Sequence, residues 1–210
     1  MRAYLEIGAE PAGPPLVWSR VPGATGERDL WMEDKRGLRR ITLSSLEDGM
    51  PGLTPSWGGV LAEASSVCLE DRGHGLVVEL SVEGRLEATL ALERLAVDPR
   101  MKRAHQDENR ATEHGACGIS ILALRSLTGF TVLYQSRGKS GFDYFLGPED
   151  EALFQVAARL EVSGIRNGTG RKIRARTREK LAQIQRAGID EPVLIAIVEF
   201  SRPRLRLEEA

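Results

Sequence analysis

An unbroken apolar run near the C-terminal end of the sequence, VLIAIVEF, sets the first limit on the fold. It lies between Pro192 and Pro203, and its first six residues are all apolar. Polar and apolar residues alternate along a strand that has one solvated face, whereas a continuous apolar run is typical of a strand buried on both faces. Buried strands of this kind are characteristic of α/β folds, so we predict one here.

The residues before this run predict a fixed order of elements. Small and apolar residues that recur at three- and four-residue spacing predict a helix with one face of small residues, which can approach a sheet closely. Two aromatic and β-branched segments around the turn RGKSG predict a hairpin, and a third segment alternates as a strand does. In chain order, the predicted elements are a helix at about 107–127, the strands FTVLYQS, FDYFL and ARLEVSG, a helix at about 172–186 that stops at Gly188, and the apolar run.

The first half of the chain is divided by Gly and Pro into short alternating segments, which predict strands. The clearest pair runs from Leu76 to Leu92 and turns at Glu83 and Gly84, with apolar residues of one parity on both arms. This pattern predicts a β-hairpin with one apolar face. Residues 38–43 and 67–69 could supply further strands, and residues 47–59 are predicted to form a loop.

A boundary is predicted near Pro99, where the sequence becomes almost wholly polar. We therefore expect a strand-rich N-terminal domain over 1–100 and an α/β domain over 101–210, which makes the chain α+β overall. The tryptophans all lie in the first half and are interpreted as core anchors rather than as platforms for stacked bases: Trp18, Trp31 and Trp57.

The overall charge gives no reason to expect a nucleic-acid or membrane partner. The chain has 29 Lys and Arg against 30 Asp and Glu, a formal net charge of -1, so any attraction to a polyanion must be local. No apolar run approaches the roughly 18 residues of a membrane-spanning helix, and no membrane partner is expected. The N-terminus lacks the pattern of a signal peptide, and two cysteines are too few for a disulfide framework, so we expect a cytoplasmic protein.

Three carboxylates fall on successive elements of the second half: Glu113 in the first helix, Asp143 in GFDYFLG and Glu161 in RLEVSG. Hydrolysis of a phosphodiester needs a hard cation that is held by a few carboxylate oxygens. Together with the order of elements, these acids resemble the core of the restriction-endonuclease-like superfamily of PD-(D/E)xK nucleases, over roughly residues 107–201. The resemblance implies that Asp143 and Glu161 bind Mg²⁺ or Mn²⁺, with Glu113 as an outer or bridging group. It also implies action on DNA, in restriction, repair or defence against mobile elements.

The sequence departs from the family motif at one position. Where the motif has a lysine two residues after the Glu, this chain has Ser163. A serine cannot supply the positive charge that stabilises a developing phosphorane. Lys139, in the turn before Asp143, is the predicted replacement, and Arg159 is a weaker candidate.

Cations are concentrated between Arg166 and Lys180, where Glu179 is the only acid. A solvated helix face usually mixes charges at i,i+4 spacing, so a block of one sign favours contact with phosphates. The predicted DNA-binding residues are Arg171, Lys172, Arg174 and Arg178.

Each acid also has a purely structural interpretation. Asp143 could be a turn residue, Glu161 a solvent-facing strand residue and Glu113 a partner of the helix macrodipole. Three hypotheses therefore stay open. The chain is a metal-dependent DNA nuclease, or it is an inactive nuclease-fold scaffold subunit of a larger assembly, as Ser163 suggests. The third hypothesis is an unrelated α+β module whose basic helix contacts an acidic protein.

Overall fold

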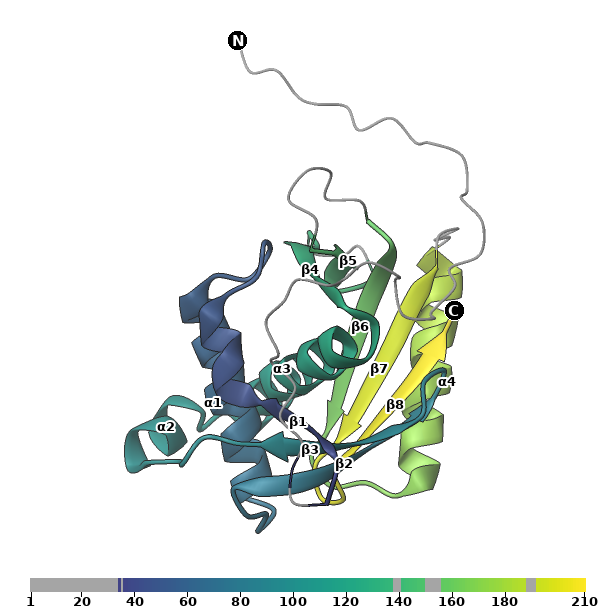
Figure 1. The fold of residues 1–210 in the computed structure, drawn as a ribbon. Coiled ribbons are helices and arrows are strands. Elements are labelled where there is room, and N and C mark those ends of the chain that lie inside the picture. Colours follow the sequence, from purple (N-terminus) through teal and green to yellow (C-terminus); the bar gives the residue numbers. More distant parts are fainter. Residues whose placement is uncertain (1–33, 35, 138–140, 150–155, 188–191) are drawn as a thin grey trace.

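In the part of the chain that the structure describes, one mixed sheet of eight strands organises the fold (Figure 1). Across the sheet, the strand order is β1-β3-β2-β8-β7-β6-β5-β4. The strands are β1 (Arg39–Thr42), β2 (Val77–Gly84), β3 (Ala88–Glu93), β4 (Phe130–Gln135), β5 (Tyr144–Pro148), β6 (Ala158–Ile165), β7 (Val193–Glu199) and β8 (Arg204–Glu209). The computed structural model describes residues 34, 36–137, 141–149, 156–187 and 192–210.

Helices cover both faces of the sheet. In chain order, the helices of the described residues are η1 (Leu43–Asp48, a 3-10 helix), α1 (Pro55–Glu70), α2 (Pro99–Ala104), α3 (Glu108–Thr128) and α4 (Gly170–Ala187). On one side, α1 and α3 pack against each other, and on the other side α4 packs against β6 and β7 (Figure 1). This arrangement confirms the predicted mixed α/β class. None of the described helices combines the length and the apolar character needed to span a membrane.

The apolar run forms β7, and every residue of this strand is buried, as predicted. Its side chains alternate between two cores. Leu194 and Ala196 belong to the large core that also contains α1 and α3. Ile195 and Ile197 pack on the opposite face with Ile173 of α4. The continuous apolar pattern therefore follows from helices on both faces of the sheet.

The second half has the predicted order of helix, three strands, helix and strand. Asp107 caps the N-terminus of α3, and Gly129 ends this helix in the left-handed conformation. The strands β4, β5 and β6 pair antiparallel, whereas β6 and β7 pair parallel on either side of the α4 crossover. Gly164 of β6 lets α3 approach this strand closely, because a Cβ at Gly164 would lie 2.4 Å from the Thr112 carbonyl oxygen. The small residues Gly115 and Gly118 of α3 pack on α1 instead. The predicted stop at Gly188 lies outside the described residues.

The first half contains the predicted hairpin, as β2 and β3. This hairpin belongs to the same sheet as the second half, since β2 pairs parallel with β8. Residues from both halves also fill one core, in which Leu80 and Leu92 lie with Leu124 and Leu205. The composition change near Pro99 therefore marks the link from β3 to α2, and the two halves share one sheet and one core.

The predicted strand at 67–69 is wrong, because these residues belong to α1. The predicted loop over residues 47–59 is correct only in part: residues 49–54 connect η1 to α1, whereas Glu47 and Asp48 end η1 and residues 55–59 begin α1. Thr54 caps this helix and Pro55 occupies its first turn, where a missing N–H costs no hydrogen bond. Gly58 allows close packing on η1, because a Cβ there would lie 1.9 Å from the Leu46 carbonyl oxygen. The glycine pair at 58 and 59 suggests a loop in the sequence, but in the fold Gly58 allows α1 to pack closely on η1.

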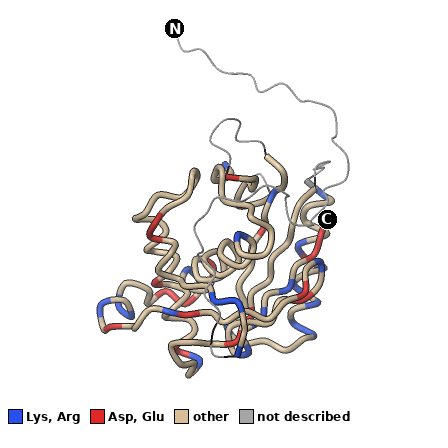
Figure 2. The backbone as a smooth tube through the Cα atoms, viewed as in Figure 1, with Lys and Arg blue, Asp and Glu red and all other residues tan. Residues whose placement is uncertain are grey.

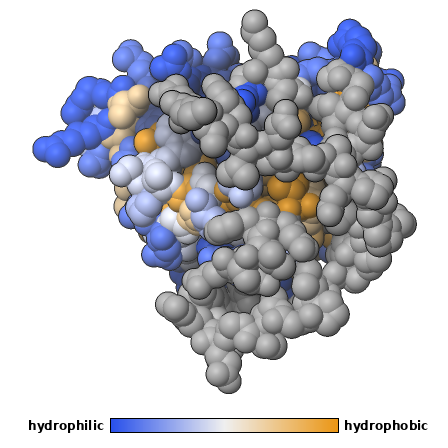
Figure 3. All heavy atoms as spheres, turned by 90° about the horizontal axis from the view of Figure 1, so that it is seen from above, coloured by the Kyte–Doolittle hydropathy of each residue, from blue (hydrophilic) through white to orange (hydrophobic). Residues whose placement is uncertain are grey.

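Apolar and hydrophilic surfaces are separated at one end of the molecule. Seen from above the end of the sheet that carries β4 and β5, apolar residues are visible near the middle of the described surface, and hydrophilic residues lie at its left and upper margins (Figure 3). The site described next lies where β5 and β6 pair.

Candidate active site

Two of the predicted acids meet between β5 and β6. Asp143 directly precedes Tyr144, which pairs with Leu160 across the two strands. The backbone N–H of Asp143 donates to the Leu160 carbonyl at 2.8 Å, and Oδ2 of Asp143 accepts from the Val162 N–H at 2.8 Å. These bonds flank Glu161, and the Asp143 and Glu161 carboxyl groups share a hydrogen bond. The strand pairing therefore fixes the two acids side by side.

A lysine from α4 completes the group. Nζ of Lys180 donates to Oε1 of Glu161 at 2.5 Å, and the two side chains are 18% and 6% exposed. The sequence prediction placed Lys180 in the cationic block but gave it no role at the acids. Helical spacing could have found it, because Lys180 follows the buried Ile173 by seven residues and the buried Thr177 by three.

Burial and mutual repulsion raise the pKa values of both acids. Burial comes first for Glu161, followed by the charge of Asp143, and together they raise its pKa to about 7 although Lys180 acts in the opposite direction. Burial also raises the pKa of Asp143, against the Val162 N–H and Lys180, which lower it. The pair therefore retains a proton near neutral pH. A divalent cation can replace such a proton, because metal binding requires the deprotonated ligand.

The acid pair faces a cavity of about 1070 Å³ that is lined by α1, α3, α4, the strand pair and the loop after β6. Glu113 is exposed on α3 and lines this cavity, and its charge contributes to the raised pKa of Asp143. Across the described ranges, no group of three or more His, Cys, Asp or Glu side chains is arranged to hold a metal ion. Two carboxylates still suit Mg²⁺, which usually keeps several waters and adds substrate phosphates as ligands.

The sequence predicted that Lys139 or Arg159 replaces the motif lysine, and the structure describes only Arg159. Lys139 lies outside the described residues. Arg159 places its guanidinium 5.4 Å from the ring centroid of Phe142 and 5.6 Å from that of Phe145, and it does not line the cavity. In the described part of the chain, Lys180 is the lysine that contacts the acid pair.

Lys and Arg recur along the backbone of α4 (Figure 2). By their position relative to the cavity, these cations fall into two rows. One row, with a spacing of four residues, lines the cavity: Lys172, Arg176 and Lys180. The other row is exposed and lies outside the cavity: Arg171, Arg174 and Arg178. Of the predicted DNA-binding residues, the structure thus brings only Lys172 into the cavity.

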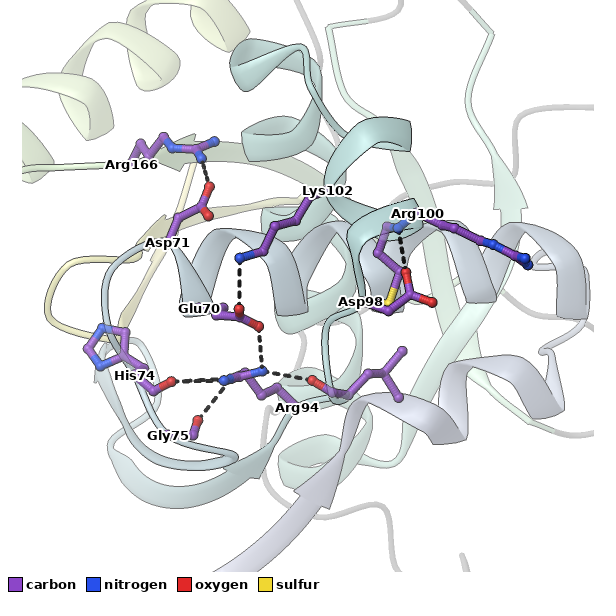
Figure 4. A network of polar contacts seen from close by, with 11 residues as sticks. Glu70, Asp71, His74, Gly75, Arg94, Asp98, Arg100, Lys102 and Arg166 are labelled. Atoms are coloured by element: carbon purple, nitrogen blue, oxygen red, sulfur yellow. Dashed lines mark hydrogen bonds and ion pairs between the residues drawn. The ribbon is translucent and has the colours of Figure 1, made fainter.

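The loop after β6 is anchored at both ends. Arg166 lines the cavity, and its guanidinium donates to Asp71 at the C-cap of α1 (Figure 4). Glu199 is 1% exposed and accepts from the Gly168 N–H at 3.1 Å and the Arg202 N–H at 3.0 Å. These contacts hold the cavity wall against α1 on one side and against the β7–β8 turn on the other.

Aromatic residues lie at another part of the cavity wall. The rings of Trp57 and His114 meet edge to face with centroids 5.1 Å apart, and both residues line the cavity. The buried Tyr144 shares a hydrogen bond with Cys117. Burial raises the pKa of the Cys117 thiol and lowers the pKa of His114. The thiolate that nucleophilic catalysis requires is therefore disfavoured at Cys117.

Comparison with known proteins adds no relative. No protein-family model, no curated protein and no solved structure matches this chain. A functional assignment therefore depends on the geometry and the charges of the cavity.

Proposed function

We propose that the chain is a divalent-metal-dependent nuclease that cleaves DNA in the cytoplasm. One observation carries the proposal: the half-buried carboxyl of Asp143 and the buried carboxyl of Glu161 lie side by side, and the Lys180 ammonium contacts Glu161, in a cavity with further cations. The pairing of β4 to β7 around the α4 crossover also supports it, because this order carries the resemblance to the PD-(D/E)xK nucleases.

Asp143 and Glu161 would hold Mg²⁺ or Mn²⁺. The bound ion would polarise the scissile phosphate and lower the pKa of a water ligand. The Val162 N–H donates to Oδ2 of Asp143 and thereby fixes the orientation of this carboxylate before the ion arrives. Such preorganisation raises metal affinity, because a mobile carboxylate would lose conformational freedom when it binds the ion.

Lys180 would supply the positive charge that Ser163 cannot. Its ammonium lies at the acid pair, so it can stabilise negative charge that develops on a phosphate beside Glu161. The motif lysine would then come from the helix after the strand, 19 residues after Glu161. Lys172 and Arg176, in the same row, would contact the neighbouring phosphates.

Calorimetric titration of Mn²⁺ tests the metal site. We expect binding heat for the wild type and none for the Asp143→Asn, Glu161→Gln double variant. Glu79→Gln is the matched control, because it removes an exposed carboxylate outside the cavity. Equal heats for the wild type and the double variant would remove the metal site from the proposal. Mg²⁺- or Mn²⁺-dependent cleavage of labelled DNA by the wild type, and its loss in the double variant, tests the activity.

The scaffold alternative is favoured by a specific observation. The Lys180–Glu161 contact neutralises one acid within the protein, as a structural ion pair does. A scaffold subunit would bind no Mn²⁺, and Lys180→Met would destabilise it without any effect on catalysis. Retained binding to DNA or to a protein partner without metal-dependent cleavage would favour this alternative.

A further inference from the structure

The cavity is larger than a metal ion and one phosphate require. Its volume of about 1070 Å³ is slightly above the roughly 300–1,000 Å³ of pockets that enclose a drug-sized ligand. Aromatic residues of α1 and α3 line one part of it, and charged residues of both signs line the rest. The cations are Arg166, Lys172, Arg176 and Lys180, and the acids are Glu108, Glu113, Asp143, Glu161 and Glu179. A ligand that fills it can therefore place negative charge along the cations of α4, bring a metal ion to the acids and set a flat apolar group against the aromatic wall.

The aromatic wall is held rigidly. Trp57 lies in the first turn of α1, where its backbone N–H donates to the Thr54 hydroxyl at 3.3 Å. The next residue, Gly58, packs directly on the Leu46 carbonyl, so this end of α1 cannot approach η1 further. Trp57 also packs against the large core while it lines the cavity. Its ring is therefore both a core anchor and a fixed part of the cavity wall.

The chemistry of this wall suits a nucleobase better than a phosphate. His114 presents a flat ring to the cavity, edge to face with Trp57 at a centroid distance of 5.1 Å. Trp57 carries no charge. Gln135, at the end of β4, also lines the cavity, and its amide can donate to or accept from the edge of a base.

We propose that the cavity takes a single-stranded segment of DNA, with one base against Trp57 and His114 and the backbone along Lys172, Arg176 and Lys180. This inference rests on the proposed function, because it assigns the substrate class of the same site. A paired base is stacked within its duplex and cannot reach a ring inside a cavity, whereas an unpaired base can stack on an aromatic side chain. The substrate is therefore single-stranded DNA or an unpaired end, and continuous duplex binds more weakly.

Tryptophan fluorescence tests the base contact while every described residue of the cavity wall keeps its wild-type identity. In a Trp18→Phe, Trp31→Phe variant, Trp57 is the remaining tryptophan. An oligothymidylate is added in EDTA, which prevents metal-dependent cleavage. We expect quenching of Trp57 by the single strand and much weaker quenching by a duplex of equal length. An unchanged Trp57 emission at saturating single strand would overturn the inference.

Affinity gives an independent measurement. Trp57→Leu should weaken single-strand binding about tenfold or more, as the loss of one stacked base does. Tyr134→Leu is the matched control, because Tyr134 is an aromatic residue with 49% exposure outside the cavity, and its loss should leave affinity unchanged. His114→Ala provides a second variant at the same wall if Trp57→Leu does not fold. Equal or tighter binding of duplex than of single strand by the wild type contradicts the inference.

The two proposals can fail separately. Quenching and single-strand preference without Mn²⁺ heat or cleavage would remove the nuclease function and leave the base-binding wall. Metal-dependent cleavage of continuous duplex, without quenching of Trp57, would support the nuclease and overturn the single-strand assignment.

Discussion

Replacement of Glu161 by Gln tests whether the acid pair is held at the expense of stability. Gln is neutral at every pH and can donate a hydrogen bond to Asp143, as the protonated acid does. The wild type changes with pH, because the pKa of Glu161 rises from 4.5 in a free side chain to about 7 in the fold. Between these values the folded chain binds more protons than the unfolded chain, so this residue lowers stability as the pH rises.

The size of the effect follows from the difference between the two pKa values. Each pH unit corresponds to about 1.36 kcal/mol, so the complete loss is about 3 kcal/mol. About 2.5 kcal/mol of this loss falls between about pH 5 and about pH 8. At roughly 2–4 °C per kcal/mol for a chain of this length, the wild type should lose about 5–10 °C in Tm relative to Glu161→Gln over this interval.

Thermal unfolding of both proteins without metal, over a series of pH values, measures this difference. Other titrating groups cancel when the two curves are subtracted, and Glu79→Gln should run parallel to the wild type. At about pH 8, Mn²⁺ should raise the Tm of the wild type and leave Glu161→Gln unchanged, because the ion stabilises only the state that binds it. Parallel pH curves for the wild type and Glu161→Gln would refute the argument that Glu161 is a strained, proton-retaining acid.

Further predictions concern the lysine, the two rows of cations on α4 and the contact between β6 and α3. Lys180→Met should reduce cleavage about 100-fold or more while DNA affinity falls less than tenfold, as single-turnover assays and binding titrations would show. Lys172→Ala combined with Arg176→Ala should weaken single-strand binding and lower the dependence of log Kd on log salt by about 1.4, because both line the cavity. Arg174→Ala combined with Arg178→Ala, in the outer row, should leave the slope nearly unchanged, and an equal loss in both double variants contradicts the assignment. Gly164→Ala should destabilise the fold by about 1–3 kcal/mol, because its Cβ would meet the Thr112 carbonyl oxygen. Gly59→Ala, whose Cβ would meet only a side-chain carbon at 3.8 Å, should be neutral or stabilising in the same denaturation assay.

Sequence periodicity was sufficient to predict those helices and strands whose faces keep the same burial from one end to the other. The strand β7 has apolar residues on both faces, and α3 keeps one small-residue face, so each pattern has a single interpretation. The helix α1 has no such pattern, because it is buried over most of its surface and contains Gly58, Gly59 and several alanines and serines. The strand β8 was not predicted. Its sequence does carry a strand pattern, because the buried Leu205 and Leu207 alternate with charged residues.

The site was predicted in part for the same reason. Order along the chain indicated Asp143 and Glu161, because neighbouring strands bring their residues together by pairing. The contribution of Lys180 depends on how α4 turns over the sheet, which spacing alone limits but does not fix. Trp57 reaches the cavity only because the first half joins the same sheet, a long-range pairing of β2 with β8 that local patterns do not contain.

The pairing of β2 with β8 also decides how this protein can be divided. A fragment limited to residues 101–210 would leave β8 with an open edge of unpaired backbone groups and would strip α1 from α3. It would lose Asp71, the partner of Arg166, and with it one support of the loop that borders the acids. The acids and the surface that a substrate base would meet therefore depend on both halves of the chain. The second half alone, fused to another protein, would contain the acids but lack the strand and the helix that support them.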